Sequence, residues 1–229
     1  MVFFFDPIYF IFILIPTILI SAGVQVWLSR TYAKWSQVPN HVGLNGLQVG
    51  KTLFTRTGLQ PIGLQTTQGD LSDHFDPSAN VVRLSHDIAT VPSVASMAVT
   101  AHELGHVQQY QTGSGMMKVR NLLVPAVKFS PTLSYICILL GLIMNVAGLF
   151  YLGILFFALM VIFTLMTVPI EFDASRRAFR LLDEAGLLVD DTDRRGSRAM
   201  LTAAGFTYVA AAVTAILQLL YYLALARHD

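Results

Sequence analysis

The sequence is poor in charged residues and in cysteine. Asp, Glu, Lys and Arg make up 13% of its 229 residues, whereas a soluble domain usually contains about 25%. Together with 54% hydrophobic residues and a mean hydropathy of +0.59, this composition indicates a membrane protein. The single cysteine, Cys137, excludes an internal disulfide framework and a zinc site built from cysteines. The sequence has no basic run with interleaved aromatic residues, so we expect no nucleic-acid partner.

Long runs without charge predict four membrane spans. Residues 129–170 contain no charged side chain, which is enough for two helices of about 20 residues each. The predicted spans are residues 7–28, 129–147, 149–170 and 201–226, with polar segments at 29–128 and 171–200. Ser130-Pro131 is a candidate start for the second span, and a start within residues 122–127 is the alternative. Because Asp6 precedes the first span and no basic residue does, we expect a retained anchor and not a signal peptide.

The distribution of Lys and Arg predicts an orientation. The segments 29–128 and 171–200 hold eight and six of the fifteen Lys and Arg residues, and Arg227 is the remaining one. Since cytoplasmic segments of membrane proteins are enriched in Lys and Arg, we expect both segments in the cytoplasm and both termini outside.

Residues 29–128 have the pattern of a small α+β unit. Residues 41–57 have helical character, 59–67 favour a strand, and 80–85 alternate enough to form another strand. We expect this second strand to form the edge of a sheet above a cleft, where an extended peptide could add through main-chain hydrogen bonds. The predicted fold class is therefore a mainly α membrane protein with four transmembrane helices and a small, zincin-like cytoplasmic α+β unit.

One motif in this unit carries chemistry. His102, Glu103 and His106 form an H-E-x-x-H element, and a helix places residues four apart on one face. Two neutral imidazoles at this spacing can bind one Zn²⁺, and Glu103 can take a proton from a water on the metal. Ser93 is a candidate N-cap of this helix, and Gly113 a candidate for its end. The alternative is a solvated histidine pair without metal.

The motif needs a third protein ligand if one position on the zinc is to stay open for water. The sequence has three glutamates; Glu103 is the candidate base, and Glu184 has the surroundings of a solvated helix end. Glu171 directly follows the third span and is the favoured ligand, with Asp173 as the competing one. If Glu171 binds the metal, Asp173 is expected to orient a histidine through its free ring nitrogen. Candidates for stabilising an oxyanion are His74, Arg176 and Arg177, although a turn role for His74 and lipid or carboxylate contacts for the arginines are alternatives.

Four segments of the chain resemble the YugP-like family of "putative neutral zinc metallopeptidases" of bacterial membranes. They are Leu71-Ser-Asp-His-Phe-Asp-Pro77, Val81-Val-Arg-Leu-Ser85, Ala101-His-Glu-Leu-Gly-His-Val-Gln-Gln109 and Glu171-Phe-Asp-Ala-Ser-Arg-Arg177. The resemblance implies an endopeptidase in the bacterial plasma membrane with one Zn²⁺ per chain, distantly similar to HtpX-type membrane proteases, and it implies Glu171 as the third ligand. Relatives have Asp four residues after this Glu, whereas this chain has Ser175, which leaves the contacts around the ligands open.

The resulting hypothesis is hydrolysis of peptide bonds in membrane or unfolded proteins. The main alternative is a non-enzymatic membrane scaffold or adaptor with a structural zinc. An intramembrane protease is disfavoured because residues 93–111 are too polar to face lipid. A metal transporter is disfavoured because the predicted spans contain no ionisable acidic or basic residue.

Overall fold

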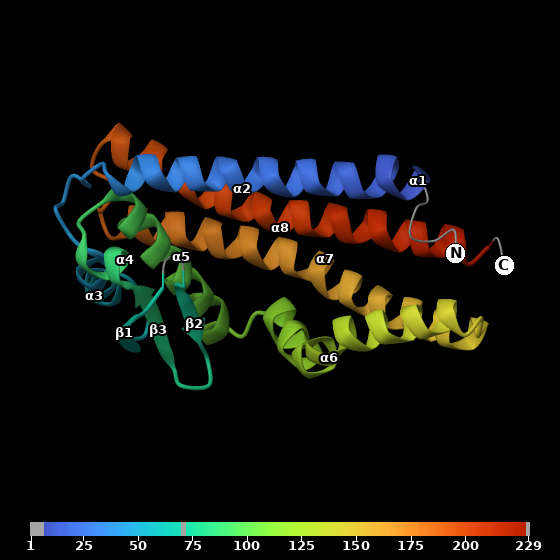
Figure 1. Ribbon diagram of the computed structural model, residues 1–229. Helices are drawn as coiled ribbons and strands as arrows, with labels where there is room; N and C mark the ends of the chain where they lie inside the picture. Colours follow the sequence, from blue (N-terminus) through green and yellow to red (C-terminus); the bar gives the residue numbers. More distant parts are fainter. Residues whose placement is uncertain (1–6, 70–71, 228–229) are drawn as a thin grey trace. The chain divides into compact units, whose positions relative to one another are not determined.

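The computed structural model describes residues 7–69 and 72–227 and is mostly helical (Figure 1). Four helical stretches in this part of the chain are long and apolar enough to cross a membrane: Pro7–Ser36, Leu122–Ile143, Ala147–Glu184 and Asp191–Leu225. The expected combination of four membrane-length helices and a small α+β portion is therefore confirmed. The predicted side of the termini stays a prediction, and residues 1–6 and 228–229 lie outside the described part.

The chain divides into two compact units. One comprises the chain up to Gln25, Lys118–Pro169 and the chain from Thr207 onward, and the other comprises Val26–Met117 and Ile170–Phe206. Four long helices contribute to both units. They are α2 (Ile15–Ser36), α6 (Gly115–Ile143), α7 (Ala147–Glu184) and α8 (Asp191–Leu225).

In the first unit, α1 (Pro7–Tyr9) and the π-helix η2 (Phe10–Leu14) precede α2, and α6 (Gly115–Ile143) supplies most of its residues to this unit. Ser130-Pro131 does not start a helix, because α6 begins at Gly115 and runs through both Pro125 and Pro131. Each internal proline removes one main-chain hydrogen bond without ending the helix. The turn between α6 and α7 contains Asn145 in the left-handed conformation, with φ 53°.

Small residues bring α6 and α7 together within this unit. A Cβ on Gly141 would lie 2.5 Å from the main-chain nitrogen of Phe150, and a Cβ on Gly153 would lie 2.7 Å from that of Ile138. The hydroxyl of Ser134 donates to the carbonyl of Gly153 at 2.9 Å. Close backbone approach and hydroxyl-to-carbonyl bonds are typical of helices that pack in lipid.

The second unit contains a three-stranded sheet with the order β1-β3-β2. Its strands are β1 (Gly63–Thr67), β2 (His74–Asp76) and β3 (Val81–Ser85); β1 pairs parallel and β2 antiparallel with β3. The strand that precedes the H-E-x-x-H helix was expected at the edge of the sheet, and this expectation is wrong. β3 is central because β2 pairs with its second edge. β2 has only three residues, and the sequence pattern does not predict it.

Helices α3 (Gly46–Arg56), α4 (His86–Thr90) and α5 (Val94–Gln111) complete the second unit and lie beside the strands in Figure 1. Asn45 and Gln48 form a capping box at the start of α3, and Ser93 caps α5 by accepting from the main-chain N–H of Ser96 at 3.0 Å. The core joins buried side chains of these helices with β3 and the ends of α7 and α8: Val49, Leu53, Val82, Leu84, Ile88, Met97, Leu104, Leu181, Leu182, Leu187 and Leu201 among others.

One contact in this core positions α5 against α7. A Cβ on Gly105 would lie 2.4 Å from the carbonyl oxygen of Ala174, which is a main-chain atom of α7. Only glycine permits this approach, because a main-chain carbonyl cannot rotate away as a flexible side chain can. Pro169 lies inside α7 just before this contact, and the helix continues through it.

We expect Gly105→Ala to destabilise the protein by about 1–3 kcal/mol, because the added methyl group overpacks the α5–α7 contact. The clash outweighs the gain of less than about 1 kcal/mol in helix propensity. The measurement is the thermal unfolding midpoint of the purified protein in detergent.

Gly115→Ala is the matched control, since nothing lies within 4 Å of a Cβ at that position. A midpoint for Gly105→Ala equal to that of Gly115→Ala would show that the α5–α7 backbones do not touch at this point.

Candidate metal centre

Helix α5 supplies two imidazoles on one face. The rings of His102 and His106 have centroids 4.8 Å apart and an interplanar angle of 83°, as the four-residue spacing predicts. Their side chains are 14% and 12% exposed. Twelve residues of α5 are buried, so the helix is covered on most sides and its orientation in the unit is fixed by packing. The helix ends at Gln111 with Thr112 as its C-cap, and Gly113 follows with φ 66°.

Helix α7 supplies the carboxylate. Glu171 is 2% exposed, and its Oε2 lies 3.3 Å from Nε2 of both His102 and His106. A buried carboxylate needs a compensating positive charge. In the described part of the chain, the two imidazoles are the partners recorded for this carboxylate. The close contact at Gly105 brings Glu171 within reach of the histidines, since Ala174 is three residues further along α7.

The three side chains fit a divalent metal. One ligand atom from each of them lies within 4.8 Å of the others. Tetrahedral zinc with bonds of about 2.0–2.2 Å separates neighbouring ligand atoms by about 3.3–3.6 Å. Both observed N···O distances, 3.3 Å, fall at this spacing. Two imidazoles and one carboxylate also form a donor set typical of zinc sites that keep a position for water.

A hydrogen-bond chain fixes the tautomer of His106. The amide nitrogen of Gln109 donates to the carbonyl of Ile170 and to Oδ2 of Asp173, both at 2.8 Å. Both amide hydrogens are thus used, and Oε1 of Gln109, 3.0 Å from Nδ1 of His106, must accept. Nδ1 therefore carries the proton, and in the neutral ring the lone pair lies on Nε2, which faces Glu171.

Asp173 thus acts on a histidine through Gln109 and not directly. It also accepts from Nε of Arg177 at 2.7 Å. Its side chain belongs to the hydrogen-bond chain behind His106, whereas the carboxylate that meets the imidazoles is that of Glu171.

The ring of His102 is oriented by a weaker contact than the ring of His106. Oγ of Ser175 lies 3.3 Å from Nδ1 of His102. Ser175 thus faces the ring nitrogen of His102 that a carboxylate orients in many metal sites. A neutral hydroxyl replaces that carboxylate here.

Electrostatics at the site favour charge on the imidazole of His106. Burial acts to lower the pKa of His106, but the hydrogen bond and the charge of Glu171 outweigh burial, and the charge of Glu103 adds to them, so that the pKa is raised above its ordinary value. Glu103 is itself 7% exposed and belongs to the same helix. The charge of Glu103 therefore lies close enough to His106 to favour its protonated form.

Two of the three oxyanion candidates, His74 and Arg177, have other partners. In the described residues, Nδ1 of His74 lies 2.8 Å from the carbonyl of Ser72, and its Nε2 lies 3.4 Å from Arg83. A turn role for His74 would pair its ring with Asp73 or Asp76, but in the described residues the ring contacts Ser72 and Arg83 instead. Arg177 is paired with Asp173, and Arg176 lines a pocket on α7 and α8. None of these recorded contacts is with His102, His106 or Glu171.

Sequence reasoning missed the role of Gln109. The residue is 1% exposed, and a signal was present. Gln109 follows His106 by three positions, which puts both side chains on the same face of the helix. A buried polar side chain on that face has to find partners, and those partners lie on α7.

Comparison with known proteins gives one family. The family model described as "Putative neutral zinc metallopeptidase" matches residues 10–227. A protein of Bacillus subtilis (strain 168), named "Putative membrane protease YugP", is 32% identical over 213 residues, which cover 93% of this chain and 94% of that protein. No solved structure matches the chain significantly.

We expect Gln109→Leu to weaken Zn²⁺ binding by about 10–100-fold, the usual cost of removing a group that orients a metal-binding histidine. Leucine fills a similar volume but leaves Nδ1–H of His106 without its acceptor. The measurement is the zinc dissociation constant, by competition with a chromophoric chelator.

Gln111→Leu on the same helix is the control, because the side chain of Gln111 bonds the main chain of Gln60 instead. Equal zinc affinities for the two variants would rule out the orienting role of Gln109.

Proposed function

We propose, from the premise that this chain belongs to the "Putative neutral zinc metallopeptidase" family, that it is a membrane-bound, zinc-dependent endopeptidase. The family match and the four apolar helices establish the coarse class, a member of a zinc metallopeptidase family with membrane-length helices. The residues that perform the reaction, the side of the membrane and the substrate are parts of the proposal.

The observation that carries the proposal is the meeting of two imidazoles from α5 with a buried carboxylate from α7. His102, His106 and Glu171 would hold one Zn²⁺ through Nε2, Nε2 and Oε2. The tautomer that Gln109 imposes on His106 supports this assignment, because a histidine binds metal through a nitrogen that carries no proton. A zincin-like unit, in which the H-E-x-x-H helix lies beside a small sheet, agrees with the position of α5.

When bound, Zn²⁺ would polarise the scissile carbonyl and acidify a water molecule. Glu103 is the residue of this chain that can accept the water proton and deliver it to the leaving amine. Its buried position on α5 keeps the carboxylate next to the imidazoles. As ligands, His102 and His106 would bind through an unprotonated Nε2, and the hydrogen bonds that their Nδ1–H groups donate to Ser175 and Gln109 hold the rings in place.

Substrate binding is proposed at an edge of the sheet. β3 is central, so an extended segment of a membrane or unfolded protein would add to β1 or β2, whose outer main-chain groups are free of strand partners in the described residues. Phe75 of β2 and Tyr110 of α5 have ring centroids 5.6 Å apart, so β2 is the edge that contacts the metal-binding helix.

We further propose that the second unit lies in the cytoplasm of a bacterial cell, with the membrane-length helices in the plasma membrane. The distribution of Lys and Arg supports this orientation, because fourteen of the fifteen lie in the polar segments 29–128 and 171–200.

We expect Glu103→Gln to abolish cleavage of an unfolded model protein while one Zn²⁺ per chain remains bound, because the amide cannot accept the water proton. Glu171→Gln should reduce cleavage through a loss of zinc. The measurements are the cleavage rate and the metal content of detergent-purified protein, with and without a chelator.

Glu184→Gln is the matched control, since Glu184 is the third glutamate of the chain and is exposed. Cleavage by Glu103→Gln at the wild-type rate would refute the mechanism. A scaffold with a structural zinc predicts no chelator-sensitive cleavage by wild-type protein at all.

The orientation can be tested by cysteine labelling in a Cys137→Ser background. We expect Gln65→Cys, exposed on β1, to react with a membrane-impermeant maleimide in inverted vesicles only. Val146→Cys, exposed between α6 and α7, should react in right-side-out vesicles only. The reverse pattern would place the second unit outside the cell.

A further inference from the structure

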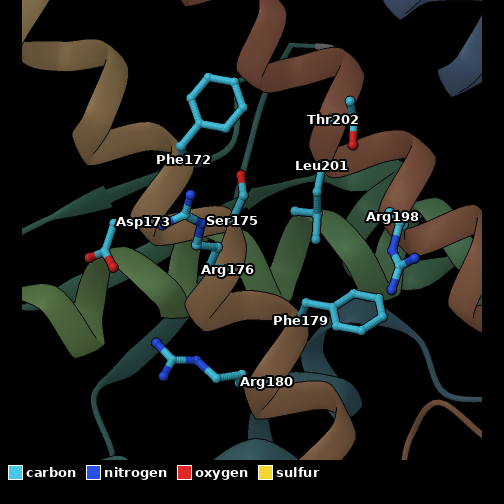
Figure 2. A pocket seen from close by; sticks show the side chains of 9 residues that line it. All are labelled: Phe172, Asp173, Ser175, Arg176, Phe179, Arg180, Arg198, Leu201 and Thr202. Atoms are coloured by element: carbon cyan, nitrogen blue, oxygen red, sulfur yellow. The ribbon is translucent and has the colours of Figure 1, made fainter.

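A pocket of about 610 Å³ lies between α7 and α8 in the second unit, apart from the three proposed metal ligands. Figure 2 shows its lining: Arg176, Arg180, Phe172 and Phe179 come from α7, and Arg198 and Leu201 from α8. The pocket thus combines guanidinium groups with aromatic and aliphatic surface.

The charge of the pocket is unbalanced. Arg176, Arg180 and Arg198 are exposed, and none of them forms an ion pair within residues 7–69 and 72–227. Asp173 is the one carboxylate in the lining, and its Oδ2 already accepts from Arg177 at 2.7 Å and from Gln109 at 2.8 Å. Three guanidinium groups are therefore available to an anion from outside the chain.

The apolar part of the pocket favours an amphiphile over a small hydrophilic anion. The guanidinium carbon of Arg198 lies 5.0 Å from the centroid of the Phe179 ring, so this side chain is held over an aromatic face. Phe172 is half-buried and Leu201 buried, and they add apolar surface next to the charges. A ligand with an anionic head and a hydrocarbon tail would match both parts.

The position of the pocket along the chain indicates which amphiphile. On α7 the lining begins at Phe172, two residues after the charge-free run 129–170 ends. On α8 it begins at Arg198, directly before residues 199–226, which also contain no charged side chain. Both helices thus contribute the pocket where their apolar stretches stop. In a membrane this is the level of the lipid headgroups, where basic pockets between helices bind anionic lipids.

We propose that this pocket binds the phosphate of an anionic phospholipid headgroup through Arg176, Arg180 and Arg198, with the start of an acyl chain against Phe172 and Leu201. The lipid proposal does not rest on the proposed hydrolytic function, although two lining residues, Asp173 and Ser175, also belong to the contacts behind the histidines. Arginine suits the role because its planar fork of donors can bond two phosphate oxygens at once.

The test uses the full-length protein in a neutral detergent and short-chain lipids, with bound lipid counted by native mass spectrometry. The probes are dioctanoyl phosphatidylglycerol, dioctanoyl phosphatidylcholine and inorganic phosphate. We expect wild-type protein to bind phosphatidylglycerol at least about tenfold more tightly than phosphatidylcholine. Inorganic phosphate at equal concentration should not displace it, because phosphate lacks the apolar contacts.

The variant Arg176→Gln/Arg180→Gln should lose most of this preference, whereas Arg194→Gln/Arg195→Gln should keep it. The two double variants remove the same charge, each from a single helix, but Arg194 and Arg195 do not line the pocket. Arg198→Lys provides an independent check on α8: it keeps the charge but loses the fork of donors, so it should show a partial loss. Thermal unfolding confirms that each variant is folded.

Three results would overturn the proposal. An equal loss in both double variants would show a general surface attraction. Displacement by inorganic phosphate at equal concentration would show a free-phosphate site. Displacement by a peptide with a free C-terminal carboxylate, but not by its amidated form, would show a site for peptide ends.

Discussion

The candidate metal centre depends on the direct backbone contact between α5 and α7. A glycine at position 105 lets the carbonyl of Ala174 approach to a distance that no side chain would tolerate. Because Glu171 precedes Ala174 by three residues, this contact also determines how close the carboxylate comes to the two imidazoles. Hydrophobic packing around Leu104 and Leu181 stabilises the same pair of helices. The same contact between α5 and α7 therefore determines both the positions of the three ligands and the packing of the core.

The contacts behind the ligands are unequal. His106 is fixed by an amide whose three polar bonds are all made, to the ring, to Ile170 and to Asp173. Within the described residues, Nδ1 of His102 meets the hydroxyl of Ser175 alone, at 3.3 Å. A satisfied buried network is rigid, whereas a hydroxyl can rotate. The ring of His102 is thus the less restrained of the two.

Much of the architecture was predictable because it rests on local signals. Runs without charge predict the membrane-length helices, and Ser93 predicts the start of α5. The four-residue spacing of His102 and His106 predicts the imidazole pair. The position of β3 in the centre of the sheet was not predictable, since three residues, His74 to Asp76, carry too little periodicity to reveal a strand. The start of the second span at Pro131 is wrong, whereas the alternative start within residues 122–127 agrees with the membrane-length stretch from Leu122. The favoured start failed because tertiary packing overrides the local helix-breaking preference of proline. The link from Gln109 to Asp173 joins positions 64 residues apart, and no local pattern reports such a pairing.

Pro169 has a mechanical consequence. It lacks the N–H that would bond the carbonyl of Leu165, so α7 lacks one main-chain hydrogen bond immediately before Ile170. Helices bend most easily at such a position. After Pro169, the part of α7 that carries Glu171 is held against α5 by the contact between Ala174 and Gly105. Flexing of the long apolar stretch can thus be absorbed at this joint, and the distances among the three ligand atoms need not change with it.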